Sequence, residues 1–221
     1  MTRPVEGYVA LVLAAGASRR MGEGRNKLLE EIEGEALVVR VVDAFLAAGV
    51  RRVVVAVGYE AERVRSALAG RPGVAFVSNP AWREGMGRSL AAGVRSLDID
   101  GGEPVSGVLV TVGDLPRLPT EAVLAVLDAH RADPSPRAIC LPTHAGRDGH
   151  PVLFGAAHFS ALAALEGDRG ARAIVEANAE HVRRVPVDSD RILRDVDTPE
   201  ELARARDEIA RRRDGAEQAD V

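Results

Sequence analysis

The sequence predicts an α/β fold with a mainly parallel sheet that helices cover on both faces. Short apolar runs alternate with amphipathic segments, the runs are almost continuously apolar, and no repeat or linker divides the chain. Continuous apolar runs are typical of strands buried on both faces. Strands that alternate with helices are typical of parallel sheets. We therefore expect one domain over residues 1–213, followed by a disordered tail over 214–221.

The first two thirds of the chain hold five predicted strands and four predicted helices. The strands are the apolar runs Tyr8–Leu13, Arg52–Val57, Val74–Val77, Val108–Val112 and Ala138–Leu141. The helices are the segments with apolar residues at helical spacing, Ala36–Ala48, Glu60–Leu68, Arg88–Leu97 and Glu121–His130. The first helix, for example, places Leu37, Val41 and Phe45 on one face and stops at Gly49, a residue type that favours helix ends.

The alternation of predicted strands and helices is less regular in the last third of the chain. A turn over residues 146–151 precedes further predicted elements, namely a strand at Val152–Phe154, helices at Phe159–Leu165 and Ala171–Ala177, and a strand at His181–Val187. Thr198 and Glu201 then form a capping box, with Pro199 at the first helical position. This pattern predicts a last helix that runs from Thr198 to about Arg213.

Composition excludes several classes of protein. The 221 residues are 46% hydrophobic and 28% charged, which is typical of a globular chain and excludes disorder for its bulk. With 29 basic and 33 acidic residues and 3% aromatics, the chain lacks the features of a general nucleic-acid binder. One cysteine, Cys140, excludes an intrachain disulfide and a thiolate zinc cluster. No apolar run approaches the ~20 residues of a membrane span, and the N-terminus lacks a signal-peptide layout, so we expect a soluble cytoplasmic protein.

A loop of small and basic residues follows the first predicted strand. It reads Leu13-Ala14-Ala15-Gly16-Ala17-Ser18-Arg19-Arg20-Met21-Gly22 and is followed by Lys27. Ligands of open α/β sheets bind at the carboxyl ends of strands, and small residues let backbone N–H groups approach phosphate oxygens. An ordinary tight turn with solvated charges explains the composition equally well. The loop lacks both the Gly-Lys-Ser/Thr of a Walker motif and the Gly-x-Gly-x-x-Gly of a dinucleotide site.

Acidic residues stand at two further positions that suit a metal ion. Asp114 follows the strand Val108–Val112, and one carboxylate with nucleotide phosphates and water is how Mg²⁺ is usually held. Asp195 and Asp197 lie two residues apart in an extended segment, so their side chains point the same way. A turn cap at Asp114 and stabilisation of the next helix by Asp195 and Asp197 are the simpler interpretations.

Taken in order, these motifs resemble the MobA-like nucleotidyltransferases, and within them the molybdenum cofactor cytidylyltransferase branch. The similarity runs from about Tyr8 to Arg206 and includes the segments Asn79–Leu90, Gly149–Phe154 and Gly167–Arg172. The resemblance implies a Rossmann-like three-layer sandwich of the nucleotide-diphospho-sugar transferase type. The spacer Glu23–Asn26 is longer than that branch usually has.

The resemblance also implies an activity, namely magnesium-dependent transfer of CMP from CTP onto a phosphorylated acceptor with release of pyrophosphate. The acceptor would be molybdopterin or the molybdenum cofactor. Arg20, Lys27 and Asp114 would be catalytic, Mg²⁺ would lie on Asp114 with Asp197 or Asp195, and Gly149 and His150 would face the acceptor. The implied nucleotide-binding residues are Leu13, Ala14, Ala15, Gly16, Ser18, Arg20, Lys27, Gly85 and Ser89. Ala15, where relatives have a second glycine, favours CTP over GTP. Trp82 would either cover the nucleotide or anchor a loop in the core, and we favour packing in the core.

Other functions stay open at this point. A sugar- or isoprenoid-phosphate cytidylyltransferase would use the same motifs with a different acceptor. Similar chains are sometimes labelled oxidoreductases, and a non-catalytic relative would handle the cofactor without the acidic residues. The implied protein partner is a molybdenum hydroxylase or its maturation factor, and we expect no nucleic-acid or membrane partner.

Overall fold

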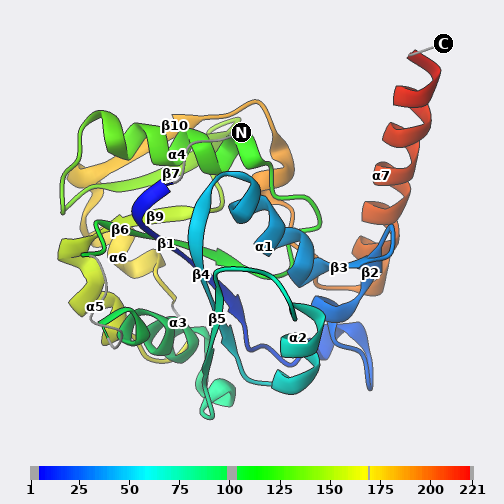
Figure 1. Ribbon diagram of the computed structural model, residues 1–221, viewed down its shortest axis with the longest axis horizontal. Helices are drawn as coiled ribbons and strands as arrows, with labels where there is room; N and C mark the ends of the chain where they lie inside the picture. Colours follow the sequence, from blue (N-terminus) through cyan, green and yellow to red (C-terminus); the bar gives the residue numbers. More distant parts are fainter. Residues whose placement is uncertain (1–4, 99–103, 169, 220–221) are drawn as a thin grey trace.

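A central sheet runs through the computed structural model, which describes residues 5–98, 104–168 and 170–219 (Figure 1). Within these residues eight strands form one sheet in the order β10-β7-β9-β6-β1-β4-β5, and β8 pairs with β7. The strands are β1 (Val5–Ala14), β4 (Val50–Val57), β5 (Val74–Ser78), β6 (Gly107–Val112), β7 (Ile139–His144), β8 (Arg147–Asp148), β9 (Val152–Gly155) and β10 (Val182–Pro186). The pairs β1–β4, β1–β6, β4–β5 and β7–β10 are parallel, whereas β9 is antiparallel to β6 and β7. The predicted mainly parallel sheet is confirmed.

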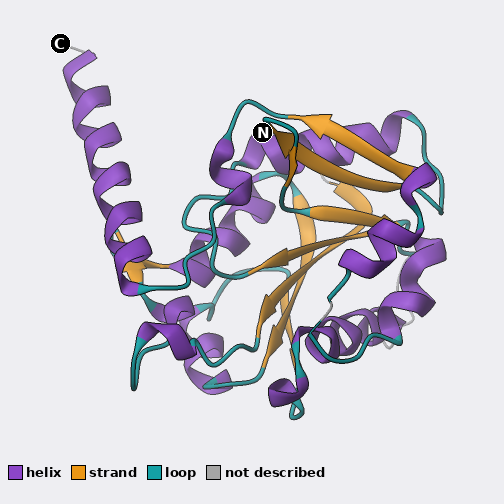
Figure 2. Ribbon diagram, turned by 180° about the vertical axis from the view of Figure 1, so that it is seen from behind, coloured by secondary structure: helices purple, strands orange, loops and turns teal. Residues whose placement is uncertain are grey.

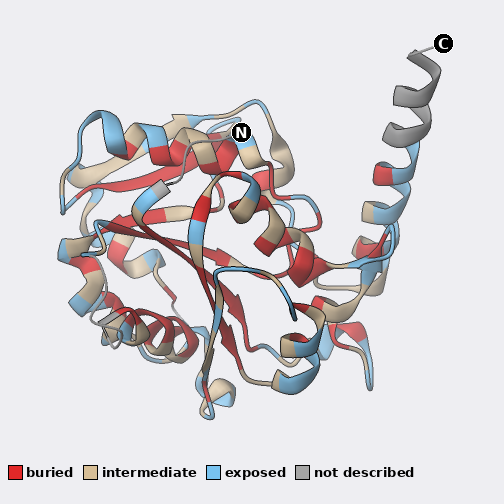
Figure 3. Ribbon diagram, in the orientation of Figure 1, coloured by how far each residue is buried: buried red, intermediate tan, exposed pale blue. Residues whose placement is uncertain are grey.

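Helices cover both faces of this sheet, as the views from the front and from behind show (Figures 1 and 2). One face carries α1 (Leu37–Ala47), α2 (Ala61–Ala67) and α4 (Thr120–Ala132), and the other carries α3 (Met86–Arg95), α5 (Phe159–Ala163) and α6 (Arg172–Ala177). In β1, Ala10 and Val12 pack on the first layer, whereas Leu11 and Leu13 pack on the second. Both faces of β1 are therefore buried, which explains its continuous apolar run (Figure 3).

The last helix, α7 (Pro199–Ala219), begins at the predicted capping box. The Thr198 N–H donates to the Glu201 carboxylate over 3.0 Å, and the Glu201 N–H donates to the Thr198 hydroxyl over 3.2 Å. Leu202 and Ile209 join a small apolar cluster, and beyond it α7 projects from the body (Figure 1). The helix continues to Ala219 instead of ending near Arg213, so the tail expected to be disordered from 214 is helical up to Ala219. Residues 220–221 lie outside the described residues.

The elements that the sequence did not predict are short. They are the hairpin of β2 (Glu31–Ile32) and β3 (Glu35–Ala36), the strand β8, and single 3₁₀ turns at Arg19–Met21, Lys27–Leu29, Trp82–Glu84, Ser96–Asp98, Ala156–His158, Ala179–His181 and Asp190–Leu193. Strands of two residues and single turns carry no hydrophobic period, so pattern alone cannot predict them. No helix in the described part of the chain is long and apolar enough to cross a membrane.

Candidate active site

The loops after β1 and β6 lie side by side because these two strands are parallel neighbours. Leu13 pairs with Val112, and the Gly113 N–H donates to the Leu13 carbonyl over 3.0 Å. The small-residue loop and Asp114 therefore meet at the carboxyl edge of the sheet, where a cavity of about 440 Å³ opens. The predicted nucleotide-binding residues that line it are Leu13, Ala15, Gly16, Ser18, Arg20, Lys27, Gly85 and Ser89. Ala14 is the exception, because it packs in the core on the α1 face.

Hydrogen bonds fold the long spacer back so that Lys27 reaches the cavity. Ser18 has left-handed backbone angles, with φ at 52°, and its hydroxyl accepts from the Lys27 N–H over 3.1 Å. The buried Asn26 side chain accepts from the Leu28 N–H over 3.1 Å and starts the turn Lys27–Leu29. The extra residues between Gly22 and Lys27 thus still leave Lys27 at the cavity. Ser18 fixes the Lys27 main chain, in addition to lining the cavity.

Two cationic side chains, Lys27 and Arg20, meet the carboxylates of Asp114 and Asp197 in this cavity. Lys27 Nζ contacts Asp114 Oδ2 and lies 2.7 Å from Asp197 Oδ1. Arg20 Nη2 lies 2.8 Å from Asp197 Oδ2. The Lys27 side chain is 15% exposed, whereas that of Arg20 is 70% exposed. Lys27 is therefore a mostly buried cation, whereas Arg20 is an exposed one.

Burial and charge act in opposite directions on the Lys27–Asp114 pair. Burial alone would lower the pKa of Lys27, but Asp114 and Asp197 outweigh it and raise that pKa above its ordinary value. Burial raises the pKa of Asp114, although the Lys27 ammonium opposes this shift. Lys27 therefore stays charged, and the ionised form of Asp114 depends on a cation beside it.

Three carboxylates lie close enough together to hold a metal ion. One ligand oxygen from each of Asp114, Asp195 and Asp197 falls within 4.8 Å of the others. Asp114 Oδ1 is buried and has no hydrogen-bond partner among the residues that the structure describes. The Val196 N–H donates to the Asp114 carbonyl over 3.0 Å. That main-chain bond ties the segment 195–197 to the end of β6. Both candidates for the second acidic ligand are thus within reach of one ion.

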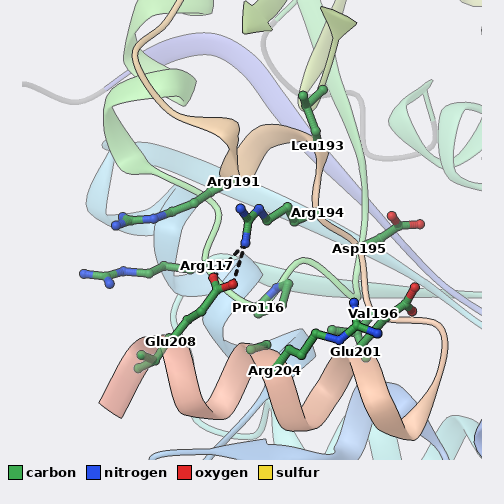
Figure 4. A pocket seen from close by; sticks show the side chains of 12 residues that line it. Pro116, Arg117, Arg191, Leu193, Arg194, Asp195, Val196, Glu201, Arg204 and Glu208 are labelled. Atoms are coloured by element: carbon green, nitrogen blue, oxygen red, sulfur yellow. Dashed lines mark hydrogen bonds and ion pairs between the residues drawn. The ribbon is translucent and has the colours of Figure 1, made fainter. Parts of the chain in front are cut away.

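Another cavity, of about 490 Å³, lies behind the segment that carries these acids (Figure 4). Arg194 crosses to Glu208 of α7 and forms bonds of 2.7 and 2.8 Å with its carboxylate. Asp195 lines this cavity, but Lys27, Asp114 and Asp197 do not. Lys27, Asp114 and Asp197 therefore face the first cavity, beside the small-residue loop.

The residues predicted to face an acceptor line a larger cavity of about 860 Å³, next to the first. Gly149 and His150 both line it, and Leu13, Met86 and Asp168 line both cavities. Its wall also includes the apolar Val110, Leu141, Val152, Phe154 and Val182. His150 Nδ1 is buried and has no partner among the described residues. Burial lowers the pKa of His150 below its ordinary value and outweighs the opposite effect of the Asp195 charge. His150 is therefore neutral at neutral pH.

Aromatic and small residues build one wall of the first cavity. Trp82 lines it, with its ring 5.5 Å from that of Tyr59. A Cβ added at Gly58 would lie 2.9 Å from the Ala15 Cβ and 2.6 Å from the Trp82 Cβ, so these groups are closely packed. The Ser89 hydroxyl accepts from Asn79 Nδ2 over 2.9 Å, which leaves its own hydrogen able to donate.

Sequence reasoning missed three residues of the two cavities. Trp82 was expected to pack in the core, but it lines the first cavity. Met86 is 46% exposed at the cavity border, and Asp168 stands beside it. A single tryptophan, methionine or aspartate carries no spacing signal. Only the motifs around these residues pointed to them.

We expect Gly85→Ala to destabilise the protein, because the Gly85 main chain packs directly against that of Gly167 at the wall of the first cavity. Gly85 has φ at +114°, and an added Cβ would lie 2.4 Å from the Gly167 main chain. The Gly87 N–H donates to the Gly167 carbonyl over 2.8 Å, so the two loops cannot simply separate. Overpacking of this kind typically costs about 1–3 kcal/mol.

Urea unfolding measures this effect, and Gly146→Ala is the matched control. Gly146 also has positive φ, at +76°, but nothing lies within 4 Å of an added Cβ. Equal losses of unfolding free energy in both variants would show that the backbone angle matters and the contact does not.

Comparison with known proteins gives the family. Residues 10–184 match the MobA-like NTP transferase domain family. A nicotine blue oxidoreductase from Paenarthrobacter nicotinovorans is 30% identical over 205 residues, which cover 88% of this chain and 94% of the relative. A bifunctional protein GlmU from Bifidobacterium animalis subsp. lactis is 35% identical over 123 residues, or 55% of this chain. The match covers only 26% of GlmU, so the chain spans about a quarter of that relative.

Solved structures agree with this result. A homolog of Mycobacterium tuberculosis rv0371c from Mycobacterium sp. strain JC1 has a TM-score of 0.76 and 26% identity, covering 92% of this chain and 97% of the other. Rv0371c from M. tuberculosis H37Rv, solved in complex with manganese, has a TM-score of 0.70 and 26% identity, covering 91% and 98%. The resemblance seen in the motifs is confirmed, and the chain belongs to the MobA-like NTP transferase domain family of nucleotidyltransferases.

Proposed function

We propose that the protein transfers CMP from CTP onto a phosphorylated acceptor, molybdopterin or the molybdenum cofactor, with magnesium as its metal ion. The observation that carries this proposal is the meeting of Lys27, Asp114 and Asp197 beside the small-residue loop. Cations for a triphosphate and carboxylates for a divalent ion, in one cavity, are what phosphoryl transfer requires. The manganese complex of the 26% identical Rv0371c supports a divalent ion.

The residues present fit such an ion. Asp114 Oδ1 is a buried oxygen without a partner, and carboxylate oxygens are the ligands that Mg²⁺ prefers. Asp114 and Asp197 would hold the ion, with Asp195 as a third ligand within reach. When bound, the ion supplies positive charge against the phosphates in the transition state.

The chain itself binds and orients the reactants. Arg20 and Lys27 take the outer phosphates of CTP, and the main chain around Gly16 lies against the phosphates nearer the ribose. A phosphate oxygen of the acceptor attacks the α-phosphorus and forms a new P–O bond, while the bond from that phosphorus to the bridging oxygen breaks. Pyrophosphate leaves with the electron pair. Because the attacking phosphate is already anionic, no side chain has to remove a proton, and catalysis consists of positioning and charge neutralisation.

The larger cavity is the proposed site of the acceptor. Its partly apolar wall and the neutral His150 suit a flat, uncharged ring system such as a pterin. Gly149 and His150 would contact that ring, and the shared border at Leu13, Met86 and Asp168 lets its phosphate reach the first cavity. A molybdenum hydroxylase or its maturation factor is the proposed recipient of the product.

We expect the protein to bind CTP more tightly than GTP, by about ten- to two-hundredfold. The methyl group of Ala15, packed against Gly58, narrows the cavity against a purine. In Ala15→Gly the ratio should fall, and Ala17→Gly in the same loop is the control. Calorimetric titration of each protein with both nucleotides measures the ratio. A wild type that prefers GTP would contradict the assignment, and an unchanged ratio in Ala15→Gly would move base selection to the Gly85–Ser89 wall.

A redox function is the second candidate, on one observation. The nicotine blue oxidoreductase is similar over 94% of its length, so a relative of this size carries a name that states a redox activity. Incubation with CTP, magnesium and molybdopterin, or with a sugar or isoprenoid phosphate in its place, tests transfer by pyrophosphate release. Oxidation of NADH or NADPH with a quinone-type dye tests the alternative. Pyrophosphate release with one acceptor only, and no oxidation of either cofactor, is the expected result.

A further inference from the structure

The ammonium group of Lys27 lies where a cation is needed to hold Asp114 and Asp197 together. It contacts Asp114 Oδ2 and is 2.7 Å from Asp197 Oδ1, and only 15% of the side chain is exposed. The carboxylates of Asp114 and Asp197 each offer an oxygen within 4.8 Å of the other. Without a cation between them, these two partly buried charges would repel each other. Lys27 thus satisfies in the free protein the same two carboxylates that the proposed function gives to a metal ion.

We propose that Lys27 is a placeholder cation that makes metal loading conditional on a bound triphosphate. The proposal rests on the proposed function of this site. In the free protein Lys27 occupies Asp114 and Asp197 and disfavours a divalent ion there. A triphosphate offers the ammonium stronger partners, draws it off both carboxylates, and so opens them to the ion. A monophosphate lacks the outer phosphates and leaves Lys27 in place.

The Lys27 side chain can change partners while its main chain stays in place. Its main chain is fixed, because the Lys27 N–H donates to the Ser18 hydroxyl and Asn26 caps the following turn. Its side chain is a flexible four-carbon stem with a compact charge, which can change partners without movement of the loop. Arg20 differs, because its side chain is 70% exposed and it pairs with Asp197 alone. Removing Arg20 should therefore free the carboxylates much less than removing Lys27.

Binding of Mn²⁺ to the free protein, without nucleotide or acceptor, tests the first half of the proposal. We expect Lys27→Gln to bind Mn²⁺ at least about tenfold more tightly than the wild type, which corresponds to about 1.4 kcal/mol. Electron paramagnetic resonance of unbound Mn²⁺ at pH 8 gives the affinity. Arg20→Gln should change it less, and Arg25→Gln, whose partner is Glu30 outside the cavity, should leave it unchanged. The double variant Lys27→Gln with Asp114→Asn should lose the gain, which locates the ion at the cluster.

Equal or weaker Mn²⁺ binding in a folded Lys27→Gln, with the fold checked by circular dichroism, would overturn the proposal. This readout needs no catalysis. The proposed function fails if no CMP is transferred, and the placeholder role fails if the Lys27 variant gains no Mn²⁺ affinity, so the two failures are distinguishable.

Carbodiimide coupling tests the second half of the proposal. In the free wild type, the contacts of Lys27 predict an amide with Asp114 or Asp197, detected by mass spectrometry of peptides. Saturating CTP without metal should suppress that amide, and saturating CMP should not. Coupling that persists at full strength with CTP would show that the triphosphate does not draw Lys27 away.

Discussion

Asp114→Asn is expected to lower the rate of pyrophosphate release by about a thousandfold or more, because a lost ligand charge removes several kcal/mol of stabilisation. Asp114 supplies a buried, unpartnered Oδ1 to the cavity, and its Oδ2 contacts Lys27. Asparagine keeps the size of the side chain but carries no charge. The fold should persist, because the Asp114 carbonyl still accepts from the Val196 N–H and Lys27 keeps Asp197.

Steady-state assays with CTP, magnesium and acceptor measure this effect. Asp197→Asn should also be severe, because Asp197 lines the nucleotide cavity, and Asp195→Asn should be milder, because Asp195 is exposed. Asp128→Asn on α4, outside both cavities, is the control for a general loss of charge. A folded Asp114→Asn that releases pyrophosphate at nearly the wild-type rate would show that this carboxylate holds no catalytic ion.

Lys27→Ala is expected to weaken CTP binding by about ten- to a hundredfold, in line with hydrogen bonds to charged groups of about 1.5–3 kcal/mol. Arg20→Ala should act in the same direction but less strongly, because its side chain is mostly exposed. Both cations line the cavity and are proposed to bind the outer phosphates, so CMP binding should change little. Isothermal titration calorimetry with CTP and CMP, in the presence of magnesium, measures both affinities.

Arg25→Ala is the control for this series. Arg25 lies in the same spacer but pairs with Glu30, 2.9 Å away, and does not line the cavity. Its affinities for CTP and CMP should match those of the wild type. Equal losses for CTP and CMP in Lys27→Ala would mean that Lys27 does not bind the outer phosphates.

The part of the site that could be predicted from the sequence is the part that the ends of the parallel strands position. The small-residue loop begins where the strand Tyr8–Leu13 ends, Asp114 follows the strand Val108–Val112, and parallel pairing of β1 with β6 brings the two loops together. The closure of the spacer before Lys27 depends on side-chain bonds from Ser18 and Asn26, which no period in the sequence reveals. The approach of Asp195 and Asp197 to Asp114 rests on the main-chain bond from Val196, across a long separation in the chain.

Two other expectations failed for local reasons. For Trp82 we favoured packing in the core over covering the nucleotide, but a single 3₁₀ turn places it at the cavity. The last helix was expected to end near Arg213, before a tail that includes Gly215, yet α7 continues to Ala219. A glycine inside a helix costs only about 1 kcal/mol relative to alanine, and the flanking residues are mostly tolerant of helix, so one glycine does not end it.

Transfer of the α-phosphate tests the central claim most directly. CTP labelled with ³²P at the α-position is incubated with wild-type protein, magnesium and molybdopterin, and the products are separated by chromatography. The label should move into the acceptor as CMP, one pyrophosphate should appear for each label transferred, and Asp114→Asn should give neither. Label that stays in CTP, in wild-type protein shown to bind both CTP and molybdopterin, would contradict transfer to this acceptor. If sugar and isoprenoid phosphates also stay unlabelled while NADPH is oxidised, nucleotidyl transfer itself is contradicted.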